Sequence, residues 1–291
     1  DTYQAQNRGG TGKRAASLKD EDFVSKLFVA NTHDTLLCFS SYGKVYWIKV
    51  YRLPRGGRNA KGRPIVNLLP LEKDERIQAV LPVKEFNDDQ FIFMATETGS
   101  VKKTKLSAYS RPMKSGIKAI KLRDGDRVVN AEITDGTKEI MLFSNSGKSI
   151  RFKESDARPM GRVSQGVRGM RIDKDQKIIS LVVLEEGNIL VATENGYGKQ
   201  TLKDEFSIQK RGGKGVIAIQ TSDRNGNLIG AKQVSTGDEV MFISTSGNLI
   251  RTRTDDISII GRNTQGVRLI RLSEDDNLLG MEKVISEDDE E

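Results

Sequence analysis

The sequence predicts an all-β protein built as a propeller-like ring of six four-stranded blades. Two repeated features lead to this prediction. A hairpin-like segment recurs five times and a loop ending in glycine recurs six times, both at intervals of roughly fifty residues. A unit of that length has room for four strands, and its sheet cannot bury both faces alone. Successive units are therefore expected to stack side by side around a ring.

Each predicted hairpin consists of an apolar run, a four-residue turn and an alternating return strand. Ile140–Phe143, for example, precedes the turn Ser144–Gly147, and Ser149–Lys153 follows it. A glycine ends each turn because this position needs positive φ. Successive turn glycines are 48 to 56 residues apart. The five turns are Ser40–Gly43, Thr96–Gly99, Ser144–Gly147, Thr193–Gly196 and Ser244–Gly247.

The glycine loops have the same period and set the predicted number of blades at six. They end at Gly12, Gly62, Gly116, Gly166, Gly215 and Gly266. An acidic turn follows most of them, and we expect these acidic turns to be solvated loop tips. The sixth blade takes its first strands from Val267–Val284 and its glycine loop from Gln6–Gly12, so the two ends of the repeat meet. Residues 1–285 form one domain, and residues 286–291 begin a disordered acidic tail.

Composition excludes several classes of protein. The single Cys38 excludes a disulfide framework and a thiolate metal cluster, and the single His33 excludes a His-rich zinc site. No apolar run is long enough to span a membrane, and no signal peptide opens the chain. With 47 basic and 40 acidic residues, the net charge of +7 favours a polyanionic partner in a reducing cytoplasm.

The repeat also organises the charge. Acid-free windows at 35–71, 98–123, 157–172 and 206–222 cover return strands and glycine loops. If every blade has the same geometry, these windows form one continuous basic rim, with the acids elsewhere. Few aromatic residues lie among the basic ones, which favours duplex phosphates over stacked single strands. Without a helix to enter a groove, base readout is weak, and bending or wrapping of duplex DNA is the expected mode.

Other candidate sites are weak. Gly9–Lys13 is similar to a phosphate-binding loop but has Asn7 and Arg14 where the motif needs Gly and Ser or Thr. The acidic pairs in Asp124–Asp126 and Asp173–Asp175 have the spacing of the other acidic turns, which argues against a magnesium site. No tyrosine lies beside an activating group. We therefore predict no catalytic residue and no metal site.

One loop carries a family resemblance. Gln209–Gly215 resembles the Q-R-R-G-G-K-G box found in the family of C-terminal domains of DNA gyrase A subunits. It differs from that box only at Lys210. Gln6–Gly12 is a weaker copy, although that family usually has its best box near the start of the domain. Leu37–Ser41, Gly62–Pro70 and Gly261–Val267 are also similar to this DNA gyrase family.

The resemblance implies a six-bladed β-pinwheel whose neighbouring blades exchange strands and whose rim wraps duplex DNA. It implies a bacterial type IIA topoisomerase that introduces negative supercoils, with two A and two B subunits, in the cytoplasm with the nucleoid. The partners are then duplex DNA, the B subunit, and the N-terminal cleavage domain of the polypeptide to which this domain belongs. ATP and Mg²⁺ are expected only in that parent enzyme, and no cofactor, no membrane contact and a monomeric state are expected for this chain.

Two alternatives remain open: the equivalent domain of topoisomerase IV, which selects the DNA substrate, and a propeller scaffold that binds a protein. For DNA binding, paired glycines let backbone N–H groups approach a phosphate while Lys and Arg supply cations, Arg211 as a bidentate grip. The predicted DNA-binding residues are Gln209, Lys210, Arg211, Gly212, Gly213, Lys214, Gly215, Gln6, Arg8, Gly9, Gly10, Gly12, Lys13, Arg14, Lys49, Arg52, Arg55, Arg58, Lys61, Lys102, Lys103, Lys105, Arg111, Lys114, Arg151, Lys153, Arg162, Arg251, Arg253 and Arg262.

Overall fold

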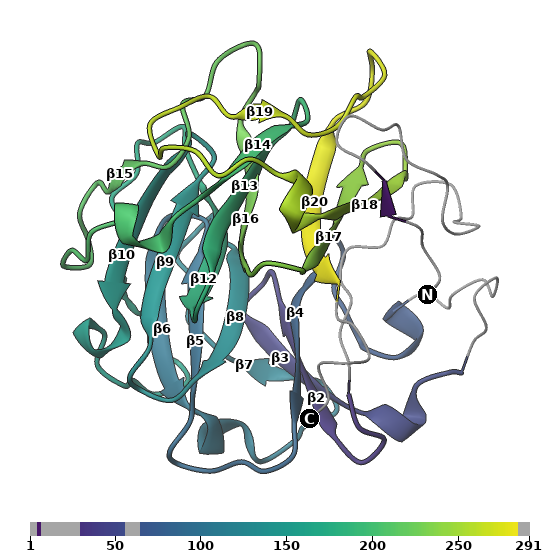
Figure 1. The fold of residues 1–291 in the computed structure, drawn as a ribbon. Helices are drawn as coiled ribbons and strands as arrows, with labels where there is room; N and C mark the ends of the chain where they lie inside the picture. Colours follow the sequence, from purple (N-terminus) through teal and green to yellow (C-terminus); the bar gives the residue numbers. More distant parts are fainter. Residues whose placement is uncertain (1–4, 7–29, 56–64, 285–291) are drawn as a thin grey trace.

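All five predicted hairpins are present in the computed structural model, which describes residues 5–6, 30–55 and 65–284 (Figure 1). Each turn glycine has positive φ, and at Gly43, Gly99, Gly147 and Gly196 the chain passes close to a neighbouring segment. A Cβ on Gly147, at φ +85°, would lie 2.2 Å from the carbonyl oxygen of Ile219. Only glycine fits this position, so the turn signature located the hairpins correctly.

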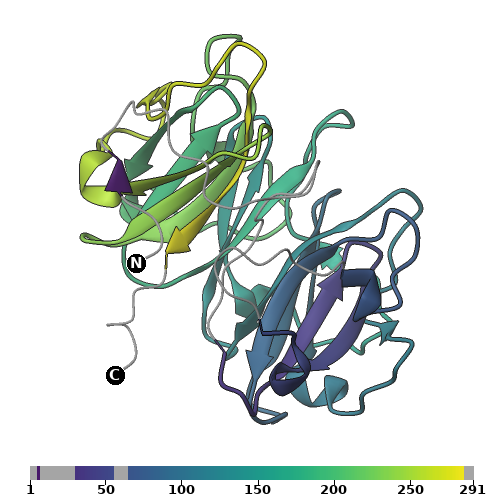
Figure 2. The same cartoon turned by 90° about the vertical axis from the view of Figure 1, so that its right-hand side faces the viewer.

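Each hairpin is the centre of a four-stranded sheet, and its strands follow in order from the ring axis outward (Figures 1 and 2). The first sheet consists of β4 (Ile77–Val83), β2 (Thr35–Ser40), β3 (Lys44–Lys49) and β7 (Ile117–Lys118). The second consists of β8 (Val128–Thr134), β5 (Phe91–Thr96), β6 (Ser100–Lys105) and β11 (Val167–Arg168). The third is β12 (Ile178–Leu184), β9 (Glu139–Ser144), β10 (Lys148–Lys153) and β15 (Val216–Ile217). The fourth is β16 (Leu228–Val234), β13 (Asn188–Thr193), β14 (Tyr197–Thr201) and β19 (Val267–Arg268). The fifth is β20 (Leu278–Val284), β17 (Glu239–Ser244), β18 (Leu249–Arg253) and β1 (Ala5–Gln6).

Short 3-10 helices connect these strands. They are η1 (Val50–Arg52), η2 (Ile65–Asn67), η3 (Leu106–Tyr109), η4 (Glu154–Asp156), η5 (Lys203–Glu205) and η6 (Thr254–Asp256). All but η2 closely follow a return strand. In the described part of the chain, no helix is long and apolar enough to cross a membrane.

The inner strands β4, β8, β12, β16 and β20 contact one another in succession and line a central hollow. They lie near the middle of the ring in Figure 1. The short outer strands β7, β11, β15 and β19 each begin directly after a glycine loop and pair with a return strand. The glycine loops therefore lie at the outer edge of the ring.

The predicted six-bladed ring is wrong: the described residues form five four-stranded blades. The prediction counted glycine loops, whereas a blade is built on a hairpin, and residues 5–6, 30–55 and 65–284 contain five hairpins. Each glycine loop in this part of the chain leads into the outer strand of a preceding hairpin, so Gly116 leads into β7, which pairs with β3. The segments assigned to a sixth blade belong to blades already counted. β19 completes the β13–β14 blade, and β20 joins β17, β18 and β1.

Strand exchange also brings the two ends of the repeat together. β1 pairs with β18 in parallel register, Ala5 beside Arg251 and Gln6 beside Thr252. The equivalent residues of other loops, Pro159, Ile208 and Ile259, form parallel bridges to the neighbouring return strand at the matching position. In the β17–β18 blade, β1 therefore occupies the position beside the return strand that a segment of a later loop occupies beside β6, β10 and β14.

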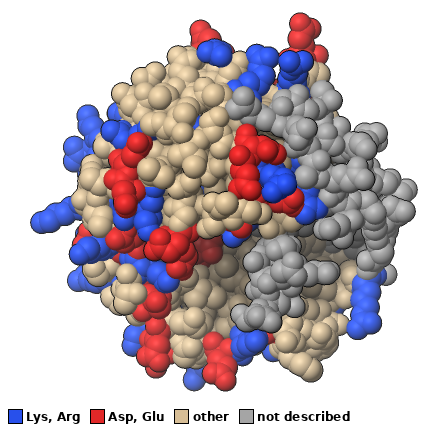
Figure 3. All heavy atoms as spheres, in the orientation of Figure 1, with Lys and Arg blue, Asp and Glu red and all other residues tan. Residues whose placement is uncertain are grey.

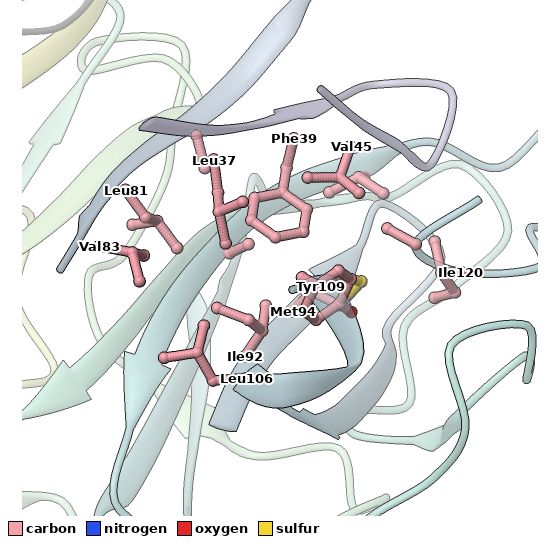
Figure 4. Close-up of a cluster of buried hydrophobic side chains, with 14 residues drawn as sticks. Leu37, Phe39, Val45, Leu81, Val83, Ile92, Met94, Leu106, Tyr109 and Ile120 are labelled. Atoms are coloured by element: carbon pink, nitrogen blue, oxygen red, sulfur yellow. The ribbon is translucent and has the colours of Figure 1, made fainter. Parts of the chain in front are cut away.

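The core is divided among the spaces between blades. Alternate residues of one hairpin strand face different neighbours, which explains why β9 is buried on both sides. Ile140 and Leu142 pack toward the β5–β6 blade, whereas Met141 and Phe143 pack toward the β13–β14 blade. Figure 4 shows the cluster between the first two blades, where the ring of Phe39 meets that of Tyr109 edge to face at 5.5 Å. Stacking of blades is therefore what buries the apolar strands.

The acidic turns are not all solvated tips, and here the expectation was wrong. Asp126 is 1% exposed, and its carboxylate accepts hydrogen bonds from the backbone N–H of Thr98 at 3.1 Å and from its hydroxyl at 2.6 Å. Asp276 caps the turn of the β17–β18 hairpin in the same way through Ser246 and Thr245. Asp173 and Asp175 are exposed, as expected. Some acids of the repeat are thus structural caps of the hairpin turns.

Candidate nucleic-acid interface

The outer edge is formed by the outer strands and the glycine loops that precede them. At the Gln209–Gly215 loop, the end glycine Gly215 has φ +73°, and a Cβ there would lie 2.1 Å from the carbonyl oxygen of Ser149. The loop therefore lies directly against the return strand β10. Its position is fixed by sequence, because any side chain at this glycine would force the loop away.

Backbone hydrogen bonds attach this loop to two neighbours. The N–H of Gln209 donates to Arg151 of β10 at 2.8 Å, and the N–H of Gly212 donates to Gly169 at 2.6 Å. The carbonyl of Gly213 accepts from Arg171 at 2.8 Å. The backbone of Gln209 therefore ties the loop to the neighbouring strand. The loop is rigidly held along most of its length.

Lys210 and Lys214 are the exposed cations of the loop. Neither forms a hydrogen bond or an ion pair with another described residue. Their ammonium groups therefore project from a fixed backbone without an internal counter-ion. This arrangement suits contact with phosphates, because the charges are placed without being neutralised.

Arg211 has a different role from the one predicted. Its Nε donates to the carbonyl oxygen of Asp156 at 2.8 Å, and its Nη1 donates to that of Arg168 at 3.0 Å. The guanidinium fork is therefore used, at least in part, to fasten the loop to the preceding blade. The expected bidentate grip on a phosphate is replaced by a grip on two backbone carbonyls.

The same contact recurs at other loops. Arg162 donates through Nη1 to the carbonyl of Lys118 at 2.9 Å, and Arg262 donates to that of Ile217 at 2.6 Å. In each case the acceptor is the second residue of the preceding outer strand. Arg162, Arg211 and Arg262, the clasp arginines, each precede the end glycine of their loop by four residues. This recurrence is visible in the sequence and was the signal that sequence reasoning missed.

The clasp position is occupied by arginine in most of the loops. Arg8 and Arg58 hold it before Gly12 and Gly62, and Pro112 holds it before Gly116. Arg8 and Arg58 lie outside the described residues. So do other predicted DNA-binding residues, namely Gly9, Gly10, Gly12, Lys13, Arg14 and Lys61.

Three predicted DNA-binding residues on return strands are internal. Lys102 is fully buried, and its ammonium group donates to the carbonyl oxygens of Ala119 and Arg162, the latter at 2.8 Å. Lys103 is 4% exposed and lies 3.8 Å from the carboxylate of Glu154. These two lysines hold the protein together, so the prediction that they face DNA does not fit the structure.

Arg151 is also internal. Its Nε donates to Glu139 at 2.7 Å, and its Nη1 donates to the carbonyl of Phe206 at 2.8 Å. Arg251 forms the matching ion pair with Glu239 on β17. Both arginines join the return strand to its hairpin partner, because each carboxylate stands on the neighbouring strand. Their charge is therefore neutralised within the blade.

The buried Lys199 holds the glycine loop that contains Gly261 and Arg262. The sequence did not predict this contact. Lys199 donates to the carbonyls of Gly261 at 2.7 Å and Arg262 at 2.5 Å, and to the hydroxyl of Thr264 at 2.9 Å. Lys102 stands at the same place in its own return strand. Burial, aided by the guanidinium of Arg162, lowers the pKa of Lys102 to about 7, and burial lowers the pKa of Lys199 to about 8.

The remaining predicted cations lie at the surface. Lys49 donates to the hydroxyl of Thr35 at 2.6 Å, and Arg253 lies 3.4 Å from the carboxylate of Asp255. The others are exposed and form no ion pair with a described residue: Arg52, Arg55, Lys105, Arg111, Lys114, Lys153, Lys210 and Lys214. In Figure 3 basic side chains project most prominently at the left edge of the ring, and acidic ones lie inside that edge and at the bottom. The basic surface is thus carried by loops and strand ends.

Comparison with known proteins identifies the architecture. The family model described as "DNA gyrase C-terminal domain, beta-propeller" matches residues 1–31, 34–84, 90–135, 138–185, 187–235 and 238–285. The model thus finds six repeats, the first of which falls almost entirely outside the described residues. The five blades described above correspond to the later matches and the β1 strand.

Curated relatives and solved structures agree with this match. The chain is 53% identical to the gyrase A protein of Salmonella typhimurium and 54% identical to that of Escherichia coli, each over 290 residues and 99% of the chain. It spans 33% of the length of each. The solved C-terminal domain of DNA gyrase A is 26% identical, with a TM-score of 0.81 over 97% of this chain and 93% of that one. The C-terminal domain of DNA topoisomerase IV is 27% identical, with a TM-score of 0.80 over 87% and 80%.

Proposed function

Because the chain belongs to the DNA gyrase C-terminal domain family, we propose that it binds duplex DNA along its outer edge and bends the duplex around the ring. The observation that carries the proposal is the pair of exposed ammonium groups of Lys210 and Lys214, fixed on a clasped loop without an internal counter-ion. Similar exposed cations, such as Lys105 and Lys114, stand at other blades. Phosphate contacts at successive blades follow a curved path.

The charge and rigidity of the edge both support bending over simple attachment. Bending a duplex costs free energy, of order 1–6 kcal/mol for a site of 20–30 base pairs, and many phosphate contacts must offset it. Loops that are already fastened lose little conformational entropy when they bind. A rim of preorganised cations therefore favours a bent duplex over a straight one that touches only one or two blades.

The wider role is also a proposal, since the chain spans 33% of its curated relatives. We infer that it serves a type IIA topoisomerase of two A and two B subunits, in which ATP bound by the B subunits drives strand passage. DNA held along this edge gives the passage a direction, so that negative supercoils are introduced. A cytoplasmic enzyme on the bacterial nucleoid fits this role.

The equivalent domain of topoisomerase IV is the second candidate, favoured by the TM-score of 0.80 to a solved domain of that enzyme. The near-intact box at Gln209–Gly215 and the relatives at 53% and 54% identity favour gyrase. A protein-binding scaffold has no comparable support.

Salt dependence of duplex binding tests the proposal. Each phosphate contact contributes a slope of about −0.9 to the logarithm of affinity against the logarithm of salt concentration. The variant K210A/K214A should therefore bind with a slope shallower by about 2. The matched control is K73A/K174A, which removes two exposed lysines from acidic turns and should leave the slope unchanged. A flat salt response of the unaltered chain, or equal effects of the two variants, would sink the proposal.

A further inference from the structure

Two arginines that the glycine loops do not use contact one buried tyrosine, and a third arginine lines the same pocket. Tyr197 is the first residue of β14 and is 4% exposed. Arg268 comes from β19, which lies beside β14 in the sheet (Figure 1), and Arg224 comes from the turn that precedes β16. Arg271 lies on the segment that leads from β19 to the next blade. Arg268 thus lies on an outer strand, but none of the three arginines is among the DNA-binding residues predicted from the sequence.

Tyr197 holds two of the arginines against itself. Its hydroxyl accepts a hydrogen bond from Nη2 of Arg268 at 2.8 Å and one from Nε of Arg224 at 3.4 Å. The guanidinium carbons of Arg224 and Arg268 lie 5.0 Å and 5.3 Å from the centre of its ring. The hydrogen bonds from Arg224 and Arg268 lower the pKa of the tyrosine. The neutral Tyr197 thus orients the positively charged guanidinium groups of Arg224 and Arg268 without neutralising their charge.

The turn that carries Arg224 is itself fastened. The side-chain amide of Asn195 donates to the carbonyl oxygens of Asp223 at 3.3 Å and Arg224 at 3.2 Å. The buried Asn225 holds the same turn through the N–H of Ser222 at 2.7 Å. The arginine therefore extends from a defined backbone rather than from a free loop.

Carboxylates do not pair with these arginines: within the described residues, none of the three forms an ion pair. Two acids, Glu274 and Asp276, line the same pocket, so three guanidinium groups stand against two carboxylates there. Asp276 directs both carboxylate oxygens to Thr245 and Ser246, and Glu274 is exposed. The arginine donors that Tyr197 leaves unused border an open pocket of about 370 Å³.

We propose that this pocket, lined by Arg224, Arg268 and Arg271, binds a phosphate group. A phosphate offers at least two equivalent acceptor oxygens in the geometry that guanidinium forks match, and three forks exceed what one carboxylate can accept. The phosphate comes either from the backbone of bound duplex DNA or from a small compound that carries a phosphate. The first source rests on the function proposed above, and the second does not.

Inorganic phosphate is the probe for the pocket itself. Titrated into the 291-residue chain, it should shift the NMR signals of the Arg224 and Arg268 Nε–H groups. The variant R224A/R268A should lose about tenfold in affinity, as expected for charge-assisted hydrogen bonds. The variant R224K/R268K keeps the charge and guards against misfolding, yet it should also lose most of the binding because it lacks the forks. Arg127→Ala is the matched control, since Arg127 stacks on the Tyr42 ring at 4.7 Å outside the pocket.

Duplex DNA distinguishes the two sources. If R224A/R268A makes the salt slope of duplex binding shallower by about 1, the phosphate belongs to the duplex. If inorganic phosphate binds at the pocket and the slope is unchanged, the site serves a small phosphate compound. Absence of any phosphate-induced shift together with an unchanged slope overturns the proposal, and so does unaltered phosphate affinity in R224K/R268K. If the chain binds no duplex at all, only the function proposed above is contradicted. The phosphate titration still tests whether the pocket binds a phosphate group.

Discussion

At the residue scale, basic side chains of this chain have two separate roles. Lys210 and Lys214 are exposed and unpaired among the described residues, whereas Arg211 between them is bound to the carbonyls of Asp156 and Arg168. A guanidinium can satisfy two carbonyls at once, and an ammonium group on a flexible stem stays in solvent more readily. Within this loop, the arginine therefore forms the clasp and the two lysines remain free for contact.

The clasp makes a prediction about Arg211. Arg211→Ala should lower the opening free energy of the Gly212 and Arg171 amides by about 1–2 kcal/mol, because both hydrogen bonds hold the same loop. Native-state hydrogen exchange measures this quantity. Lys210→Ala is the adjacent control and should leave both amides protected. Equal protection in the two variants would show that the clasp is not what holds the loop.

The buried Lys102 predicts a pH dependence of stability. Its pKa falls from 10.5 to about 7 because of burial and the neighbouring Arg162, so between these values the unfolded chain binds more protons than the folded one. Stability from this group therefore rises with pH across that interval and is lowest below pH 7. Relative to Lys102→Met, the unaltered chain should gain up to about 2 kcal/mol of unfolding free energy between pH 7 and pH 9. Urea unfolding of both at the two pH values checks this, and a constant difference contradicts it.

At the element scale, the hairpin turn and the acidic turn of the same blade act as one unit. Asp126 reaches from its turn to the backbone and hydroxyl of Thr98, and Asp276 does the same at Ser246 and Thr245. The cap joins the inner strand to the hairpin of the same blade, at the end of the sheet where the acidic turn and the hairpin turn lie side by side. Each such cap fixes the position of the inner strand.

Removal of one cap should show its value. Asp126→Ala removes a buried carboxylate and its two hydrogen bonds to Thr98, and it should reduce the free energy of unfolding by about 1–2 kcal/mol. The control Asp124→Ala removes an exposed carboxylate from the same turn and should change it by less than about 0.5 kcal/mol. Equal losses in denaturant unfolding would show that burial of Asp126 contributes nothing beyond its charge.

The elements show how far the sequence could be interpreted. The hairpins were predicted correctly because Gly147 and its equivalents need positive φ, a local requirement that leaves a local signature. The number of blades was not, because Val267–Arg268 pairs with β14 whereas Leu278–Val284 pairs with β17, and this division between two blades leaves no local pattern. The functional residues divided in the same way. Lys210 and Lys214 lie at the surface, as a DNA-binding role requires, whereas Lys102 and Lys103 point to opposite faces of a strand that is covered on both. The sequence of one strand cannot reveal that both of its faces are covered.

At the scale of the whole molecule, stacking explains both the stability and the proposed function. Apolar clusters lie between successive blades, so every blade except the terminal ones is buried on two faces. The narrow outer edges, where the glycine loops lie, remain free to present charge. The clasp arginines Arg162, Arg211 and Arg262 fasten their loops to the preceding blade, which fixes the edge at these three loops.

The central claim is that this edge bends duplex DNA rather than merely binding it, and a topological measurement tests it most directly. A nicked circular duplex is saturated with the 291-residue chain, sealed with a ligase, stripped of protein and analysed for its linking number. A bent path around the ring should leave a change in linking number that grows with the amount of bound chain and is reduced in K210A/K214A. A duplex that is bound but sealed with no change in linking number would contradict the account.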